Sequence, residues 1–435
     1  MITGKNQRRA VAAVAMALGG AAVLAGCSGS SSSSVTALST DPVTITATFW
    51  GGDTRVQLTQ EAIDAFEKEY PNITVEPQYT DWTGYWDQLA TETAAGDMPD
   101  VVQMDETYLS SYASRGSLYD LSDLSIDTSN FDESTVDLGK VDDTQYAIPI
   151  GVTVYAIIAN KTLFDQYGVD LPDDDTWSWD DYAALADELT EASDGAITGS
   201  AQIGGFETGS VKYWARSEGG ELFDDDGSVA LDPQALADMW QFELDLQSSG
   251  GMQSAAEITE SQNAGIGAGA LATNAVAMGT LWNTQITAIQ AASGDDFVLL
   301  KLPEPDDVNP YFYKPSMYWS ISSQSEHPAE AAAFVDFMLN SDEAGAILGT
   351  ERGVPANNEI REAITSSLTE TDQAAIAYLD SITPGDTPAP TPNGASTIED
   401  ILERYTQEVF AGQSEPLDAA DAFISELQGE IDAAG

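Results

Sequence analysis

The order of secondary-structure signals between residues 43 and 104 constrains the fold of this chain more than any other feature. Val43–Phe49 alternates β-branched with smaller residues, which predicts a strand, and apolar residues from Leu58 to Tyr70 recur at helical spacing. Ile73–Val75 then predicts a second strand. A strand, a helix and a strand in this order predict a βαβ unit with a right-handed crossover.

The same pattern repeats once more along the chain. A helix is predicted over Tyr85–Ala95, and Val101–Met104 is typical of a buried strand. Asp105 directly follows that strand, as Trp50–Arg55 follows the first strand. Ligands of open α/β sheets bind outside the carboxyl ends of the strands, so we expect both segments to border a binding site.

Later segments alternate between helix and strand signals, which favours an α/β fold. The strand-like run Ala147–Tyr155 is interrupted by Pro149 and Gly151, which suits a chain that crosses between two lobes. Helices are predicted from Trp179, with Ser178 as N-cap, over Pro233–Gln247 and Pro328–Leu339. Strands are predicted at Phe297–Leu302 and Tyr318–Ser322, a compact turn at Glu351–Pro355, a proline-rich loop at Pro384–Pro392, and two closing helices.

The N-terminus has the order of a secretory signal peptide. Lys5, Arg8 and Arg9 precede an apolar stretch, Ala10–Ala25, that is too short for a comfortable transmembrane helix. Leu24-Ala-Gly-Cys27 matches the bacterial lipoprotein box. We therefore expect residues 1–26 to be removed, Cys27 to carry lipid, and the serine-rich residues 27–41 to form a flexible tether. The alternative is an ordinary signal peptide with an incidental cysteine.

Composition limits the partners of the mature chain. Removing residues 1–26 leaves about 409 of 435 residues, enough for two domains on the usual size range. The net charge of −57 becomes −60, because three positive and no negative charges are lost. Such a charge excludes nucleic acid as a partner and repels an anionic lipid leaflet. Cys27 is the only cysteine, so no intrachain disulfide is possible.

Several short segments, taken in their order, resemble the extracellular solute-binding proteins of the maltose-binding-protein family, which serve ATP-binding-cassette importers. The resemblance covers roughly residues 43–430, although most pocket positions depart from the maltose-binding protein itself. It is carried by the lipoprotein box, Phe49–Gly52, Ala65–Val75, Pro99–Val102, Ile148–Ile150, Asn160–Lys161, Ala275–Met278 with Trp282, and Gly353–Pro355.

The resemblance implies two lobes, each an open, mostly parallel sheet flanked by helices, with a ligand cleft between them. It places the first lobe at residues 42–152 plus 305–352 and the second at 153–304 plus 353–435. It also implies a monomeric sugar receptor, lipid-anchored outside the cell, that hands its ligand to a membrane permease.

Aromatic and polar side chains are the candidates for sugar contacts, since a sugar offers flat C–H faces and hydroxyl groups. Asp105 is favoured by its strand-end position, Trp50 by its loop and Trp282 by its match to a family pocket tryptophan. Trp177 and Trp179 flank a helix cap and are interpreted as structural. The predicted ligand-binding residues are Trp50, Asp53, Arg55, Trp82, Trp86, Asp105, Tyr108, Trp214, Trp282, Trp319, Arg352 and Asn393.

Catalysis has little support in the sequence. His327 is the only histidine, G-x-S-x-G is absent, and 72 acidic residues make any carboxylate pair uninformative. Asp224–Gly227 lacks EF-hand spacing and is interpreted as a turn. We therefore expect no cofactor and no metal. A secreted glycoside hydrolase and a receptor for a non-sugar solute remain the alternatives.

Overall fold

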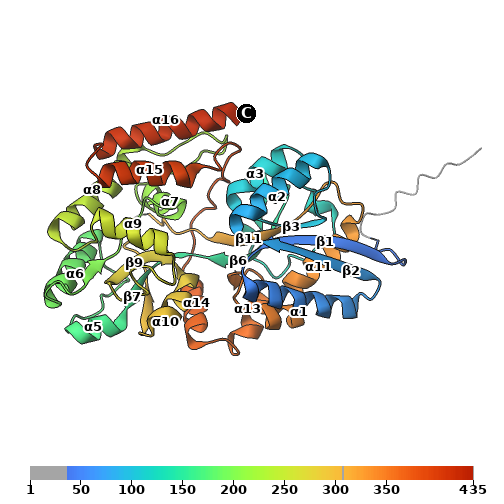
Figure 1. Ribbon diagram of the computed structural model, residues 1–435, viewed down its shortest axis with the longest axis horizontal. Helices are drawn as coiled ribbons and strands as arrows, with labels where there is room; N and C mark the ends of the chain where they lie inside the picture. Colours follow the sequence, from blue (N-terminus) through green and yellow to red (C-terminus); the bar gives the residue numbers. More distant parts are fainter. Residues whose placement is uncertain (1–36, 306–307, 435) are drawn as a thin grey trace, which may run out of the picture. The chain divides into compact units, whose positions relative to one another are not determined.

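The predicted βαβ unit opens the fold. In the computed structural model, which describes residues 37–305 and 308–434, β1 (Val43–Trp50) pairs in parallel with β2 (Ile73–Thr80), and α1 (Asp53–Glu69) connects them (Figure 1). The predicted signal sequence and Cys27 lie outside the described residues.

Six strands form the first sheet, in the order β12-β6-β11-β3-β1-β2. The added strands are β3 (Val101–Met104), β6 (Ile148–Thr153), β11 (Lys314–Ile321) and β12 (Val354–Pro355). The helices and short strands in its segments are α2 (Trp82–Ala95), α3 (Glu106–Ser114), η1 (Leu121–Asp123), α4 (Glu133–Asp137), β4 (Lys140–Val141), β5 (Thr144–Gln145), α11 (Pro328–Asn340), α12 (Asp342–Leu348) and α13 (Asn358–Thr365).

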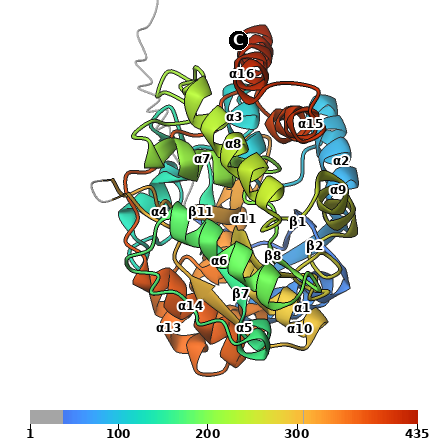
Figure 2. The same cartoon turned by 90° about the vertical axis from the view of Figure 1, so that its left-hand side faces the viewer.

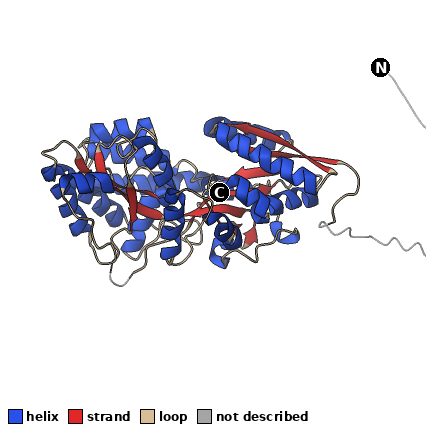
Figure 3. Ribbon diagram, turned by 90° about the horizontal axis from the view of Figure 1, so that it is seen from below, coloured by secondary structure: helices blue, strands red, loops and turns tan. Residues whose placement is uncertain are grey.

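Helices cover both faces of this sheet because its strands are apolar on both sides (Figure 3). Val101 belongs to the same core cluster as Phe66 of α1, whereas Val102 packs in a second cluster with Tyr85 of α2. Successive side chains of a strand point to opposite faces, so α1 and α2 lie on opposite sides of the sheet.

Four strands form the second sheet, in the order β10-β7-β9-β8. They are β7 (Tyr155–Asn160), β8 (Thr198–Ser200), β9 (Val276–Trp282) and β10 (Phe297–Leu300). The helices of these segments are α5 (Lys161–Tyr167), α6 (Trp179–Ala192), α7 (Thr208–Ser217), α8 (Pro233–Ser249), α9 (Ala255–Ala264), η2 (Asn283–Gln285) and α10 (Ile286–Ser293). Ser178 is the N-cap of α6, as predicted, and it also forms a capping box with Asp181.

The expectation of mostly parallel sheets is wrong. Among the described strands of the two sheets, only β1–β2, β1–β3 and β8–β9 pair in parallel, and the other neighbours are antiparallel. β6 leads the chain out of the first sheet and β11 brings it back, and β11 pairs antiparallel with both β6 and β3. Hydrophobic alternation is the same in either strand direction, so the sequence pattern could not reveal this.

The chain first passes between the sheets within Ala147–Tyr155, the strand-like run that Pro149 and Gly151 interrupt in the sequence. β6 belongs to the first sheet, and β7 continues from it into the second after the single residue Val154. The chain returns from β10 to β11. After α13 it reaches α14 (Glu370–Ser381), which packs against α10 and β10.

The C-terminal helices join the second sheet's segments. α15 (Ile398–Phe410) and α16 (Pro416–Ala434) pack against each other and against α8 (Figures 1 and 2). Their contact is a separate core cluster that includes Trp240, Leu402 and Phe423. In residues 37–305 and 308–434, no helix has the length and apolarity that a membrane crossing requires.

Candidate ligand-binding site

Four of the predicted aromatic residues lie together at one edge of the first sheet. Trp50 ends β1, Trp82 and Trp86 lie on the first turns of α2, and Tyr108 lies on α3. The Trp86 and Tyr108 rings stack with centroids 3.8 Å apart, and Trp50 meets Trp82 edge-to-face at 4.9 Å. We call these four residues the aromatic wall. Trp82 is 43% exposed, so the wall offers an apolar face to a ligand.

A cluster of buried charges lies beside the aromatic wall. Asp105 directly follows β3 and caps α3, accepting the Thr107 N–H at 2.9 Å. The carboxylate of Glu106 lies 3.6 Å from the ammonium of Lys212 on α7 and 3.8 Å from that of Lys314 on β11. Burial acts to raise the pKa of Glu106, but the two lysines together hold it below its usual value.

Side chains of the second sheet's segments complete this charged cluster. Trp282 ends β9, and its indole N–H donates to the carboxylate of Glu207 at 2.9 Å. The ammonium of Lys314 lies 5.7 Å from the centre of the Trp282 ring. Glu399 on α15 keeps an exposed side chain. Partial desolvation of its carboxyl group, and then the negative charge of Glu207, raise its pKa to about 7. The side chains of the candidate site therefore come from segments of both sheets.

The carboxylates of this site outnumber its cations. Glu106 is paired with Lys212 and Lys314, whereas no ion pair involves Asp105, Glu207 or Glu399 among the described residues. Burial raises the pKa of Glu207 as well. An arrangement of carboxylates and indole rings can accept hydrogen bonds from hydroxyl groups and cover a sugar ring.

Three predicted site residues lie elsewhere. Trp319 is only 1% exposed and faces Phe334 of α11 in the sheet core, because its position on β11 points it away from the site. Trp214 is buried against Trp179 and Phe242 in the core of α7 and α8. The Asn393 amide donates to the carbonyl of Ala434 at the end of α16. These side chains do not line the site.

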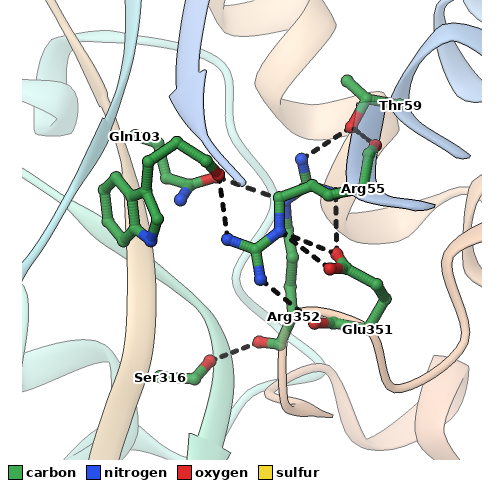
Figure 4. A network of polar contacts seen from close by, with 7 residues as sticks. Arg55, Thr59, Gln103, Ser316, Glu351 and Arg352 are labelled. Atoms are coloured by element: carbon green, nitrogen blue, oxygen red, sulfur yellow. Dashed lines mark hydrogen bonds and ion pairs between the residues drawn. The ribbon is translucent and has the colours of Figure 1, made fainter. Parts of the chain in front are cut away.

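Arg55 and Arg352 brace the backbone near the aromatic wall. Arg352 is 2% exposed and donates to Thr59 Oγ1 at 2.7 Å (Figure 4). Its guanidinium also lies over the Phe49 and Trp319 rings. Burial, with the charge of Arg55, lowers its pKa to about 9. Arg55 donates to the Trp50 carbonyl and to Glu351. Asp53, by contrast, is exposed in the first turn of α1.

The sequence reasoning missed Glu106, Lys212, Lys314, Glu207 and Glu399. A signal existed for the lysines, since a mature chain with 12 basic residues rarely places one inside an apolar run such as Val211–Ala215. Glu106 directly follows the predicted Asp105. Nothing in the sequence distinguishes Glu207 or Glu399 from the other acidic residues, because their role depends on packing between distant segments.

Other hollows suit a sugar less well. One of about 600 Å³ is lined by residues that include Lys301, Asn309 and Thr383, and it has Tyr311 as its single aromatic ring. A hollow of about 250 Å³ beside Gly265, Gly269 and Leu271 has no aromatic ring. In the described part of the chain, no group of three or more histidine, cysteine or acidic residues is placed to hold a metal ion.

The model of the bacterial extracellular solute-binding protein family matches residues 51–345. The chain belongs to this family. The family resemblance predicted from the sequence is thereby confirmed, and the membership implies a periplasmic or extracellular location. Its proteins bind solutes and are not a class of enzymes.

Solved structures confirm the two-lobed fold. The family 1 extracellular solute-binding protein from Alicyclobacillus acidocaldarius is 26% identical, with a TM-score of 0.72 over 90% of this chain and 99% of that one. A periplasmic oligogalacturonide-binding protein from Yersinia enterocolitica, in complex with saturated digalacturonic acid, is 23% identical, with a TM-score of 0.74 over 90% and 99%. The GacH receptor of Streptomyces glaucescens, solved with acarbose, is 19% identical, with a TM-score of 0.71 over 90% and 100%.

Proposed function

We propose that the protein is a lipid-anchored receptor that binds a carbohydrate outside the cell and delivers it to the permease of an ATP-binding-cassette importer. One observation carries the proposal: an aromatic wall with Trp82 exposed lies beside partly buried carboxylates drawn from segments of both sheets. The structural neighbours with digalacturonic acid and acarbose support a carbohydrate as the class of ligand.

The charges of the site favour a neutral sugar over an acidic one. Four carboxylates, those of Asp105, Glu106, Glu207 and Glu399, face two ammonium groups, both already directed at Glu106. A uronic acid would bring a further negative charge into a partly buried place, where like charges repel strongly. Neutral hydroxyl groups would instead donate to the unpaired carboxylates. We therefore propose that this receptor rejects the digalacturonic acid of the Yersinia protein.

The resemblance placed the lobes at residues 42–152 plus 305–352 and residues 153–304 plus 353–435. The second boundary needs a correction, because β12 pairs with β6 of the first sheet and α13 packs against α12 and β12. We therefore propose that residues 353–365 belong to the first lobe. Lobe closure about the crossing segments would bring both halves of the site onto one ligand and exclude water. A ligand that contacts both lobes selects the closed state by its differential affinity. The closed receptor is then the form that a permease would recognise.

A thermal-shift panel tests the carbohydrate proposal. We expect one of maltotriose, cellotriose or xylotriose to raise the melting temperature, since a ligand at 100 times its dissociation constant stabilises by about 2.7 kcal/mol. Trp82→Ala should abolish the shift. Tyr79→Ala is the matched control, because Tyr79 is also exposed, at 54%, but lies outside the aromatic wall. Stabilisation by digalacturonic acid alone would contradict the proposed charge preference.

The alternatives give different outcomes in simple assays. If the protein were a glycoside hydrolase, chromatography of the same oligosaccharides after incubation would show shorter products. A receptor for a non-sugar solute would leave every sugar of the panel without a shift. The family membership favours binding without turnover.

Lipid anchoring rests on the Leu24–Cys27 motif. We propose that Cys27 carries the lipid and that the serine-rich segment after it is the tether. Cys27→Ala should release the protein into the medium, measured by immunoblotting of membrane and medium fractions. Retention of the variant on membranes would count against the anchor.

A further inference from the structure

The side chain of Arg55 joins two loops that are far apart in the sequence. Arg55 lies in the first turn of α1, and its Nη1 donates to the Trp50 carbonyl oxygen at 3.0 Å. Its Nε lies 2.9 Å from both carboxylate oxygens of Glu351, and Nη2 donates to the Glu351 carbonyl at 3.3 Å (Figure 4). All three guanidinium nitrogens are engaged, a geometry that a lysine cannot reproduce.

The loop on one side of Arg55 carries the aromatic wall. Trp50 is followed by Gly51, and a Cβ at Gly51 would lie 2.4 Å from Cδ of Arg55. The arginine therefore lies directly over a turn that only glycine fits. Trp50 pairs with Thr80 of β2, and the Gly51 N–H donates to the Thr80 carbonyl at 3.1 Å. Because glycine leaves the turn after Trp50 conformationally free, the bond from Arg55 to the Trp50 carbonyl adds a second restraint on the end of β1.

The loop on the other side of Arg55 lies against the strands that cross between the sheets. Ser316 of β11 donates to the carbonyl of Arg352. A Cβ at Gly151 of β6 would lie 2.6 Å from the same carbonyl oxygen. Glu351 and Arg352 are thus held on β6 and β11, each of which connects to the second sheet.

We propose that Arg55 is a positioning residue for the ligand site: it fixes the Trp50 indole of the aromatic wall relative to the crossing strands β6 and β11 through Glu351. This inference rests on the proposed function in one respect: the effect on affinity requires that the aromatic wall binds a carbohydrate. It adds that Arg55 affects the affinity without touching the ligand. A conformational change at the crossing strands would reach the aromatic wall through the ion pair between Arg55 and Glu351.

A purely structural brace would behave differently. If Arg55 only stabilised the start of α1, replacing it would lower the melting temperature and leave the orientation of Trp50 unchanged. If Arg55 positions Trp50, the replacement must change a signal that depends on that indole. Trp50 lies within 6 Å of Trp82, Tyr85 and Trp86, so its orientation contributes to the near-ultraviolet circular dichroism of the cluster.

Circular dichroism of the free protein tests this without any sugar. The difference spectrum between the wild type and Trp50→Phe defines the contribution of Trp50. We expect Arg55→Lys to lose more than half of that contribution while retaining the far-ultraviolet spectrum. Arg361→Lys is the matched control: Arg361 also pairs with a carboxylate, Asp380, and donates to a backbone carbonyl, that of Pro355 at 3.1 Å. The control should keep the full contribution.

A second variant and a binding cycle complete the test. Glu351→Gln keeps the shape of the loop, removes the charge, and should reproduce the spectral loss of Arg55→Lys. With the tightest-binding trisaccharide of the panel, Arg55→Lys should weaken binding about tenfold in the wild type and have no further effect in the Trp50→Ala background. A full Trp50 contribution in both Arg55→Lys and Glu351→Gln would overturn the inference. If no trisaccharide binds, the proposed function fails, while the spectra still decide the role of Arg55.

Discussion

Asp105 is the N-cap of α3 and also our leading candidate for a ligand contact. Its strand-end position predicted a site residue, and the structure places it beside Glu106 and Tyr108 in the candidate site. The same carboxylate accepts the Thr107 N–H as the N-cap of α3. Since one oxygen makes the cap, the role in ligand binding has to be separated from the cap by experiment.

Asp105→Asn separates the two roles, because asparagine is also a good N-cap but carries no charge. We expect the variant to change the melting temperature little and to weaken sugar binding roughly tenfold, or about 1.4 kcal/mol. Asp232→Asn is the control, since Asp232 caps α8 in the same way, at 2.9 Å from the Gln234 nitrogen, outside the site. Wild-type affinity of Asp105→Asn in calorimetry would assign Asp105 to the cap alone.

Glu243 gives the fold a pH dependence that is independent of ligand. It is fully buried on α8 and accepts the N–H groups of Ile203 and Gly204 at 2.7 and 2.9 Å. Burial raises its pKa from 4.5 to about 8. The folded protein therefore keeps a proton that the unfolded chain loses above pH 4.5, so stability falls as the pH rises from about 4.5 to 8.

Glu243→Gln mimics the protonated form and should remove this loss. We expect denaturant unfolding of the wild type to lose up to about 1.4 kcal/mol per pH unit across this window from Glu243 alone. The variant should be more stable than the wild type at pH 8 and show no such advantage at pH 4.5. Equal pH profiles of the two proteins would show that Glu243 is ionised in the fold.

The positions of candidate site residues were predictable where they directly follow a recognisable strand. Asp105 follows a buried strand, and the Trp50 loop follows another, so their shared edge follows from strand geometry. Trp319 and Trp214 lie in cores away from the candidate site, because an aromatic residue looks the same in a core and in a site until the facing element is known. Glu207 and Glu399 escaped notice for the same reason, since what faces each of them comes from a distant segment.

At the scale of elements, strand β6, which leads the chain towards the second sheet, has no room for a side chain at Gly151. Gly151 lies where β6 pairs with both β11 and β12. Its missing side chain leaves room for the backbone: a Cβ there would lie 2.6 Å from the Arg352 carbonyl oxygen and 2.9 Å from that of Val354. The glycine that interrupted the strand pattern in the sequence thus permits a close approach of backbones.

Gly151→Ala should push β12 away from β6. We expect a loss of about 1–3 kcal/mol in the free energy of unfolding, the usual cost of overpacking, measured by urea denaturation. Gly429→Ala on α16 is the control, because a Cβ there meets nothing within 4 Å. That change should stabilise the helix by about 0.5–1 kcal/mol. Unchanged stability of Gly151→Ala would mean that the crossing accommodates a methyl group freely.

Element positions were predictable because caps, periodicity and strand composition act locally. The helix from Pro233 and the N-cap at Ser178 were located from their first turns, and Val101–Met104 was located from its composition. Strand direction and sheet order were not, because pairing partners such as β3 and β11 are about 200 residues apart, and alternation carries no direction.

At the scale of the molecule, the candidate site depends on segments of both sheets being brought together. Glu106 follows a strand of the first sheet, whereas Lys212 and Trp282 belong to segments of the second. The sheets are connected near Ile150–Thr153 and Pro303–Pro305, and a third connection follows the Arg352–Pro355 turn. We propose that these segments act as the hinge of the receptor.

Small-angle scattering tests that hinge. A sugar that contacts Trp82 on one side and Trp282 on the other gains its full set of contacts only when the lobes close, so the ligand must shift the population toward the closed state. We expect the radius of gyration to fall when the best sugar of the panel is added at saturation. Trp282→Ala is the control that separates closure from simple binding: a sugar held by the aromatic wall alone has no reason to draw in the second lobe, so this variant should bind more weakly and compact less. An unchanged radius of gyration in the saturated wild type would refute the hinge and place the whole binding energy on one lobe.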